Sequence, residues 1–518
     1  MPTSFSYHQS TRYNRHLMEP HVLDWQNQPL PYKIYSGIQP FHLPEIRDLY
    51  QGTLSRVAGF EDISSSEGTL DLEDLSRILY LGNGLTGKIR QGGGDFYFRS
   101  APSAGALYPN EIYLVWPGSD DLPSGVFHCG VHNRCLTRLR QGNFVPAMRD
   151  SVKTGTSDPV AVFVITGIFF RSAWKYRRRA YRYVMMDAGH VMENLRLAIR
   201  AAGKTCRLVV AFDDPAVNHL LGLDPEKEVS IGFIHVYAKE TASADILPVI
   251  PPNISVDPLP KRIREASKTS DNEIRYKEIL DIHQAGIGNS GLTVPTADMF
   301  TCLGVSYASF RPIHYPNGLN DGEPLEQTIL PYSKTVYSRR SHRNFIPHPM
   351  RHSQLTFLLD LICRASDDSD HAYSSAMAVG LLTGNVAGMP PGFYLIDVRQ
   401  RRLHCVFERQ VTDEMAAVCL DQKWLAHAGV HFLFMTNLDV IDRQWGPRGY
   451  RYAMITAGRL GHVVYLGATA LGLGSCGIGA LYDAEAQRLL GLNSASVLVY
   501  VVAAGPVKKK LDDSREAV

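Results

Sequence analysis

The sequence has almost no excess of charge of either sign. Lys and Arg together number 53 against 51 Asp and Glu, which gives a formal net charge of +2. Proteins that bind nucleic acid or an anionic membrane through a broad electrostatic patch normally carry a strong basic bias. The composition therefore argues against both kinds of partner, and any site for an anion must be formed locally.

Targeting signals and long apolar runs are also missing. Residues 1–20 contain no apolar stretch of the kind found in a signal peptide. The longest apolar runs, at 160–170 and 496–505, are far shorter than a membrane span and rich in β-branched residues, so they predict buried strands. We expect a cytoplasmic protein that does not enter a membrane.

Cysteine patterns of metal or redox sites are absent. The eight cysteines are scattered, none belongs to a Cys-x-x-Cys motif, and no Cys/His cluster has the spacing of a zinc site. We expect reduced, buried thiols and no metal. The sequence also has no low-complexity tract, and 518 residues are too many for one ordinary core, so two or more domains are expected.

What the sequence does contain is a long internal repeat. The segment that begins YRYVMMDAGH at Tyr181 aligns without a gap with the segment that begins YRYAMITAGR at Tyr450, an offset of 269 residues. A second pair of segments, 125–136 and 392–403, matches at nearly the same offset. A period this long indicates the duplication of a domain of about 200 residues rather than a solenoid.

Each copy predicts the same kinds of element. A long helix with apolar residues at helical spacing follows each YRY and ends near Gly203 or Gly472. Strand-like runs flank it, which predicts an α+β layer fold in each half. We expect a first domain at 1–250, a linker or wrapping arm at 251–330 and a second domain at 331–518. The two copies should pack as an intramolecular pseudo-dimer, and two chains could pair further.

One basic motif is suited to a phosphate. RRSHRNF (339–345) places three arginines and a serine within five residues, ahead of an apolar run that predicts a helix. Guanidinium groups and a hydroxyl bind a phosphate dianion well, and a helix N-terminus adds to the attraction. A solvated basic turn is the alternative explanation of this motif taken alone.

Two segments of small residues are suited to a flat ligand. PSAG (102–105) forms a loop ahead of a strand, and GLGSCGIG (472–479) connects two predicted helices. Small residues let the backbone approach a planar group closely. The second segment is not a dinucleotide fingerprint, because that motif follows a strand and opens a helix. An ordinary turn and a strained connector are the alternatives.

Two pairs of polar residues are candidates for proton chemistry or for interface contacts. Lys175 and Tyr176 place an ammonium group beside a phenol. Both groups can move a proton when burial shifts their pKa values towards neutrality, and a surface lysine beside a packed tyrosine is the alternative. His190 and Asn194, four residues apart on the first long helix, are expected to form a hydrogen-bonded pair in the interface.

Taken together, these segments resemble the SagB-type dehydrogenases of the nitroreductase superfamily. Those are FMN enzymes that oxidise azolines to azoles in thiazole- and oxazole-bearing peptides, and their flavin lies between two protomers. The resembling blocks cover almost the whole chain except 251–330 and are SYHQSTRY, RSAPSAGALYPNEIYLV, KYRRRAYRYVMMDAGHVMEN, RRSHRNF and YRYAMITAGRLGHVVYLGATALGLGSCGIGALYD. The resemblance implies FMN as the cofactor and a small molecule or a peptide as the substrate.

The resemblance also assigns a role to each motif. The residues that it places around the phosphate are Arg339, Arg340, Ser341, Arg343, Lys508 and Lys510. The residues that it places around the flavin ring are Gly477 and Ile478 from the second half, and Pro102, Ser103, Ala104 and Gly105 from the first. Lys175 and Tyr176 would be the catalytic pair, with Tyr176 as the base and Lys175 as its helper.

The two copies have diverged in a complementary way. RRSHR projects onto 59–63 of the first copy, GFEDI, where no arginine occurs and Glu61 would repel a phosphate. The second copy has lost the PSAG loop, and the residues aligned with the Lys-Tyr pair are Gln444 and Trp445. We therefore predict one composite site and one FMN per chain.

Three functions remain open on the sequence. The first is a dehydrogenase that oxidises an azoline or a similar C–N or C–C bond. The second is an NAD(P)H-dependent nitro or quinone reductase, in which NAD(P)H is a further partner. The third is a non-catalytic flavin-binding or scaffold subunit of a biosynthetic complex. Bleaching of a bound flavin by NAD(P)H would favour the second, and a colourless protein the third.

Overall fold

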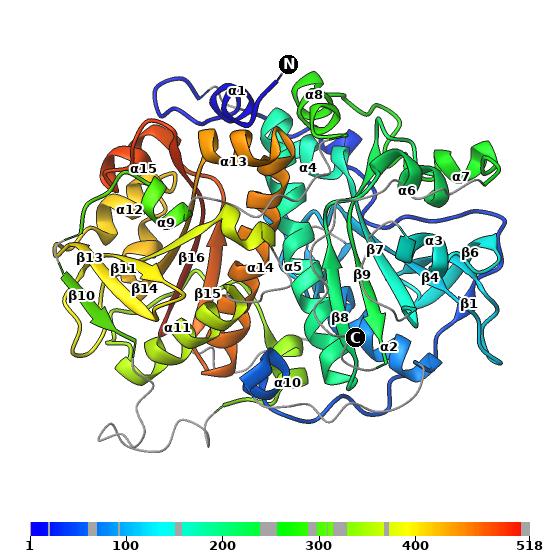
Figure 1. Ribbon diagram of the computed structural model, residues 1–518, viewed down its shortest axis with the longest axis horizontal. Helices are drawn as coiled ribbons and strands as arrows, with labels where there is room; N and C mark the ends of the chain where they lie inside the picture. Colours follow the sequence, from blue (N-terminus) through cyan, green and yellow to red (C-terminus); the bar gives the residue numbers. More distant parts are fainter. Residues whose placement is uncertain are drawn as a thin grey trace.

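The chain folds into two α+β halves that lie side by side, one in blue to green and the other in yellow to red (Figure 1). The structure is a computed structural model, and it describes residues 2–18, 21–60, 70–91, 94–150, 158–238, 256–288, 298–307, 309–313, 329–366 and 372–508. One set of buried apolar side chains runs through both halves without a break. The two halves therefore share a core, which confirms the predicted pseudo-dimer.

The first half is built on a seven-stranded antiparallel sheet with the strand order β1-β6-β5-β4-β7-β9-β8. Its strands are β1 (Phe41–His42), β4 (Asn110–Trp116), β5 (Gly125–Gly130), β6 (Cys135–Gln141), β7 (Ala161–Ile168), β8 (Thr205–Val209) and β9 (Glu228–Tyr237). A separate hairpin joins β2 (Leu85–Gln91) to β3 (Gly94–Arg99). Strands β7 and β9 are buried along their whole length, as their β-branched composition predicts.

The second half repeats this sheet strand for strand, in the order β10-β13-β12-β11-β14-β16-β15. Its strands are β10 (Ser309–Pro312), β11 (Ala378–Thr383), β12 (Gly392–Asp397), β13 (Arg402–Phe407), β14 (Val430–Asn437), β15 (Gly474–Ile478) and β16 (Ser496–Gly505). The segment GLGSCGIG thus contains an edge strand, β15. The identical strand order confirms the duplication.

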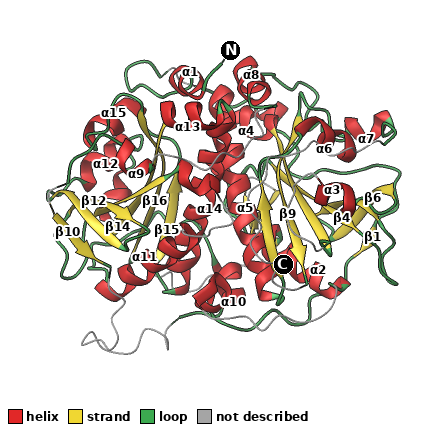
Figure 2. Cartoon of the chain, viewed as in Figure 1, coloured by secondary structure: helices red, strands yellow, loops and turns green. Residues whose placement is uncertain are grey.

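Two long helices lie between the sheets, α5 (Ala180–Ala201) and α14 (Arg448–Ala470) (Figure 2). A Cβ atom on Gly458 would lie 2.0 Å from the carbonyl oxygen of Met186, and one on Gly189 would lie 2.2 Å from that of Ile455. Any larger residue would force the two backbones apart. The two contacts are equivalent under the sequence offset, so this crossing marks the pseudo-twofold axis.

Shorter helices cover the outer faces of the sheets and the ends of the long pair. They are α1 (Ser4–Ser10), α2 (Leu72–Asn83), α3 (Val145–Asp150), α4 (Phe169–Tyr176), α6 (Asp214–Leu221), α7 (Lys261–Glu265), α8 (Lys277–Ala285), α9 (Met299–Cys302), α10 (Tyr332–Ser338), α11 (His352–Ser366), α12 (Thr412–Val418), α13 (Leu438–Trp445) and α15 (Asp483–Leu489). In the part of the chain that the structure describes, none of the helices is long and apolar enough to cross a bilayer. All eight cysteines are free, and all except Cys206 and Cys302 are buried.

Two elements of the segment predicted as a linker repeat elements found near the N-terminus. Strand β10 pairs with β13 at the edge of its sheet, as β1 pairs with β6. On α8, the ring of His283 lies 3.5 Å from the hydroxyl of Tyr181, and on α1 the ring of His8 lies 3.0 Å from that of the equivalent Tyr450. The repeat therefore extends into 251–330, where its short elements leave too few matching residues to be detected in the sequence.

Buried ion pairs join the halves at the N-terminal end of each long helix. Asp483 of the second half binds Arg179 at 2.8 Å and Arg182 at 2.7 Å, both from the first half. The equivalent cluster, related by the offset of 269 residues, consists of Asp214, Arg448 and Arg451. Carboxylate and guanidinium groups this deeply buried hold a fixed geometry, because any separation would leave an uncompensated charge.

Candidate functional site

A cavity of about 210 Å³ opens on the seam between the two halves, and we name it the seam cavity. From the first half it is lined by Pro102, Ser103, Ala104, Gly105, Lys175, Tyr176, Tyr183, Met186, Asp187 and His190. From the second half it is lined by Ser341, Arg343, Gln422, Tyr465, Cys476, Gly477, Ile478, Gly479, Ala480 and Tyr500. The structure thus brings together the small-residue loop, the Lys-Tyr pair, part of the basic motif and the glycine-rich strand.

The small-residue loop is fixed by a buried carboxylate. The hydroxyl of Ser103 donates to Asp187 on α5 at 2.6 Å, and the backbone N–H of Ala104 donates to the same group at 3.2 Å. Gly105 has a φ of 65°, and a Cβ atom on it would lie 2.8 Å from the hydroxyl of Tyr176. Glycine is required here both by its left-handed backbone and by this close approach.

Lys175 and Tyr176 occupy the last turn of α4 and face this loop. A Cβ atom on Gly105 would also lie 3.3 Å from Nζ of Lys175. Burial raises the pKa of Tyr176, whereas burial and the charge of Arg343 lower the pKa of Lys175. The lysine is therefore the member of the pair that gives up its proton more readily, and the tyrosine keeps its proton.

Ser341 and Arg343 reach the cavity because their segment runs beside the edge strand β15. Ser341 forms a bridge with Ser475, and the backbone N–H of His342 donates to the carbonyl oxygen of Ser475 at 2.8 Å. Ser341 and Arg343 are both exposed, at the mouth of the cavity. An arginine and a serine at an open mouth can meet an anionic end of a ligand.

Tyr465 links the glycine-rich strand to Ser341. The backbone N–H of Gly477 donates to the Tyr465 hydroxyl oxygen at 2.5 Å, and that oxygen lies 3.0 Å from Oγ of Ser341. Either hydroxyl can donate in the second contact, because each carries one proton and its oxygen can also accept. The Gly477 N–H is thus engaged within the protein, and Tyr465 holds the Ser341 hydroxyl at the mouth of the cavity.

Four residues of the predicted phosphate site are not among those lining the cavity. Arg339 is buried and donates to the carbonyl oxygens of Ser100 at 2.7 Å and Arg99 at 3.0 Å, so it holds the halves together. Arg340 donates to the carbonyl oxygen of Thr86 at 2.6 Å. Carbonyl groups at and just after the end of β3, and near the start of β2, thus bind both guanidinium groups. The remaining two are Lys508, which is exposed, and Lys510, which lies outside the described residues.

A relay of hydrogen bonds crosses the interface behind the cavity. The side-chain N–H of Asn194 donates to the carbonyl oxygen of Gly82 at 3.1 Å, so its Oδ1 atom accepts from Nε2 of His462 at 2.9 Å. Nδ1 of His462 then accepts from Nδ1 of His190 at 3.3 Å, and Nε2 of His190 accepts from the Tyr500 hydroxyl at 3.1 Å. The chain of donors fixes both tautomers and leaves the Tyr500 oxygen as an acceptor towards the cavity.

This relay differs from the sequence-based expectation and from its own symmetry mate. His190 and Asn194 do not bond directly, because His462 of the other half lies between them. The offset of 269 relates His190 to Arg459 and His462 to Glu193. Arg459 and Glu193 form a buried ion pair at 3.1 Å on the other side of the pseudo-twofold axis. The seam cavity is thus backed by two imidazoles whose pKa values burial lowers, and the opposite side by fixed charges.

Asp187 is expected to make the protein less stable as the pH rises. Burial raises the pKa of its carboxyl group from 3.8 to about 7, although the bonds from Ser103 and Ala104 oppose this. A pKa that is higher in the folded state gives stability that is complete below about pH 4 and is lost as the pH rises through about 7. In urea unfolding, the natural protein should therefore lose about 2–4 kcal/mol of unfolding free energy between pH 4 and 8, and Asp187→Asn should not. An identical pH dependence in both proteins would contradict this role.

Several lining residues were not predicted from the sequence, and one of them has a detectable signal. Asp187 aligns with Thr456 in the second copy, so a carboxylate appears on one repeat only. A polar difference between the two long helices, beside the small-residue loop, could have marked it. Tyr465 and Tyr500 look like ordinary apolar positions of a helix and a strand, and only their contacts reveal their place in the cavity.

Comparisons with known proteins agree with the fold. The profile of the Nitroreductase family matches residues 65–236 and 336–506. A crystal structure from Anabaena variabilis that carries the name nitroreductase superposes with a TM-score of 0.73 at 23% identity, over 98% of this chain and 99% of that chain.

Two curated relatives match parts of the sequence. MJ1384 of Methanocaldococcus jannaschii, which also carries the name nitroreductase, is 26% identical over 34% of this chain and 90% of its own length. The trifolitoxin-processing protein TfxB of Rhizobium leguminosarum bv. trifolii is 28% identical over 28% of this chain and 41% of its own length.

Proposed function

Because this chain belongs to the nitroreductase family, we propose that it is an FMN-dependent oxidoreductase whose single flavin site is the seam cavity. The observation that carries the proposal is the composition of that cavity, which takes Ser103 to Gly105 and the Lys-Tyr pair from one half and Ser341, Arg343 and Gly477 from the other. Neither half contains a complete set, so the site exists only because the two copies pack together.

The residues of the cavity suit FMN in their chemistry. At the mouth, Arg343 supplies positive charge and Ser341 a hydroxyl group, two groups that suit a phosphate. Met186 and Ile478, which are 3% and 5% exposed, present apolar surface suited to an aromatic ring. The cavity therefore offers both the cationic and the apolar contacts that the cofactor can use.

The protein's own part in the reaction is to bind, orient and move a proton. Bound FMN would supply two-electron redox chemistry. Nζ of Lys175, whose pKa burial lowers, would accept a proton from a substrate carbon next to an imine. The hydroxyl of Tyr176, which keeps its proton, would orient the substrate beside Gly105. In this proposal Lys175 is the base, a role that the sequence resemblance gives to Tyr176.

The substrate that fits best is an azoline or a similar ring with an oxidisable C–N or C–C bond. The Lys-Tyr pair occurs once and lines the same cavity as the phosphate-binding candidates. The resemblance to SagB-type dehydrogenases and the similarity to a trifolitoxin-processing protein both favour chemistry on a peptide.

The first test is the flavin content of the purified protein. We expect a yellow protein with one FMN per chain, measured by absorbance after release of the cofactor. Ser341→Ala and Arg343→Gln should each weaken FMN binding by at least about tenfold, because each removes a donor to the phosphate. Arg409→Gln is the matched control, since Arg409 pairs with Glu414 on the surface of the same half. A colourless protein that takes up no FMN would refute the proposal and favour a scaffold subunit.

A nitro or quinone reductase is the second candidate, and the nitroreductase names of two similar proteins favour it. The two candidates differ in the source of electrons. Rapid anaerobic bleaching of the bound flavin by NADH or NADPH would support a reductase. Bleaching by a thiazoline- or oxazoline-bearing peptide, without response to either nucleotide, would support the dehydrogenase.

A further inference from the structure

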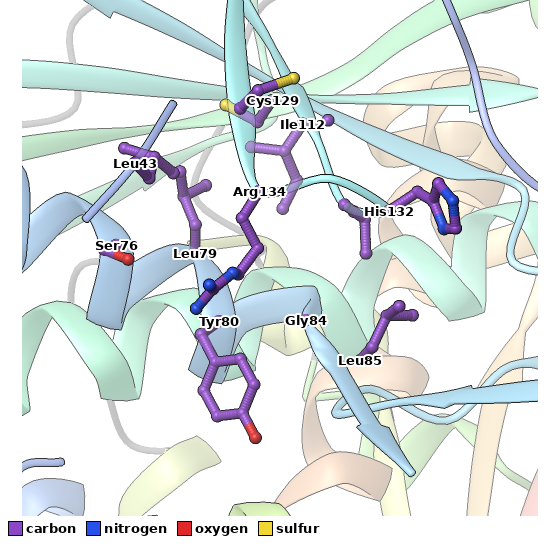
Figure 3. A pocket seen from close by; sticks show the side chains of 13 residues that line it. Leu43, Ser76, Leu79, Tyr80, Gly84, Leu85, Ile112, Cys129, His132 and Arg134 are labelled. Atoms are coloured by element: carbon purple, nitrogen blue, oxygen red, sulfur yellow. The ribbon is translucent and has the colours of Figure 1, made fainter. Parts of the chain in front are cut away.

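A second cavity lies in the first half and shares no lining residue with the seam cavity. Its volume is about 280 Å³, and Figure 3 shows it between helix α2, the start of β2 and the turn that joins β5 to β6. We name it the hairpin cavity after that turn. None of the site residues predicted from the sequence lines it.

Most of the wall of the hairpin cavity is apolar. It includes Leu79 of α2, Leu85 of β2, Ile112 of β4 and Cys129 of β5. Burial raises the pKa of the Cys129 thiol well above its ordinary value, so this group is neutral. The hydroxyl of Ser76, which also lines the cavity, already donates to the carbonyl oxygen of Pro44 at 2.8 Å. The interior therefore favours an apolar ligand body.

The mouth of the cavity is cationic. Arg134 is exposed, and its side chain extends from the turn towards α2, between Leu79 and Tyr80 (Figure 3). None of the lining residues is an acid. Within the described residues, Arg134 takes part in no ion pair. In the described part of the chain, no carboxylate pairs with this guanidinium group at the edge of an apolar cavity.

The second repeat shows what occupies the corresponding place. Arg401 aligns with Arg134 in the same turn, and the two share an unusual left-handed backbone, with φ values of 52° and 45°. Arg401 is not free, because it forms an ion pair with Asp360 of α11, whose side chain is 3% exposed. The helix at this place in the first half, α2, presents Tyr80 beside the arginine instead. One copy supplies its own carboxylate, and the other offers a cavity.

We propose that the hairpin cavity binds a small organic carboxylate with an apolar body. The carboxylate would meet Arg134 as Asp360 meets Arg401, and the apolar part would fill the space against Leu79, Ile112 and Cys129. A single planar guanidinium group matches the two oxygens of a carboxylate, whereas a phosphate normally recruits several cations. The inference does not depend on the flavin site.

Calorimetric titration with octanoate and with octanol tests the proposal on the full chain. We expect octanoate to bind with one site per chain and octanol to bind at least about tenfold more weakly, because only the acid pairs with Arg134. Arg134→Gln should remove this preference. Arg138→Gln, on the same hairpin but outside the cavity lining, should bind octanoate as the natural protein does.

A reciprocal substitution makes the test stricter. Tyr80→Asp places an internal carboxylate beside Arg134, as in the second repeat, and should abolish octanoate binding while the melting temperature shows that the variant is folded. The proposal is overturned if octanoate does not bind the natural protein, or if it binds Arg134→Gln with unchanged affinity. FMN content measured in the same samples separates this result from the outcome at the seam cavity.

Discussion

Replacement of Lys175 by Met is expected to lower turnover by about 10²–10⁴-fold while FMN stays bound. The lysine lies beside Gly105 in the seam cavity, and its replacement leaves the Ser341 hydroxyl and the Arg343 guanidinium group in place. Its loss removes the proton acceptor without removing a phosphate contact. Tyr176→Phe should lose turnover as well, because the hydroxyl beside Gly105 disappears. Steady-state rates and the flavin absorbance of the same samples provide the measurement.

The pH profile separates the two members of the pair. Since the pKa of Lys175 lies below its ordinary value, turnover of the natural protein should rise with pH as this group loses its proton. The rise of turnover with pH should persist in Tyr176→Phe and be absent from the residual turnover of Lys175→Met. Gln444→Met changes the aligned residue of the second copy and should leave turnover intact. Full activity in the Lys175→Met variant would exclude Lys175 as the base.

Replacement of Asp483 by Asn is expected to lower the free energy of unfolding by about 3–5 kcal/mol. The change leaves the guanidinium groups of Arg179 and Arg182 buried without their counter-charge. Arg179 also donates to the carbonyl oxygen of Gly479, which lines the seam cavity, at 3.1 Å. We therefore expect weaker FMN binding in addition to lower stability, measured by urea unfolding and by flavin titration.

Asp214→Asn is the matched control, because it breaks the equivalent cluster on the other side of the axis. It should cost a similar unfolding free energy and leave the FMN affinity of the folded protein unchanged. Burial alone would raise the pKa of Asp483, but its two arginines outweigh this and hold the pKa well below its ordinary value. Its contribution is thus present above about pH 4 and lost on acidification below it. A loss below about 1 kcal/mol in both variants would refute the structural role.

Much of the fold follows from the sequence because it depends on local patterns repeated twice. The strand runs and the helix after each YRY have periodicities that identify α5, α14 and the central strands without any knowledge of contacts. The duplication then predicts two similar halves. The sequence also predicts a helix from Asn272 to His283, which overlaps α8. The short strand β10 could not be assigned in this way, since it is recognised by the strand with which it pairs.

The candidate site was predicted in part for the same reason. Ser341, Arg343 and the small-residue loop stand out as motifs, and the cavity contains them. Arg339 has the same local signal as Arg343, yet the nearby carbonyl groups of Arg99 and Ser100 bind its guanidinium group. Sequence identifies an arginine that can bind an anion, but the nearest acceptors in space decide what it binds.

The sequence by itself determined that the chain is a duplicated α+β protein with one intact set of site motifs. This information is local and survives in residue order, because strand, helix and turn preferences act over a few neighbouring residues. Only the tertiary structure decided that the Lys-Tyr pair faces the basic motif, that His190 reaches Asn194 through His462, and that Arg134 lacks the partner held by Arg401. Those relations join residues far apart in the chain, and packing of the two copies about their shared axis creates them.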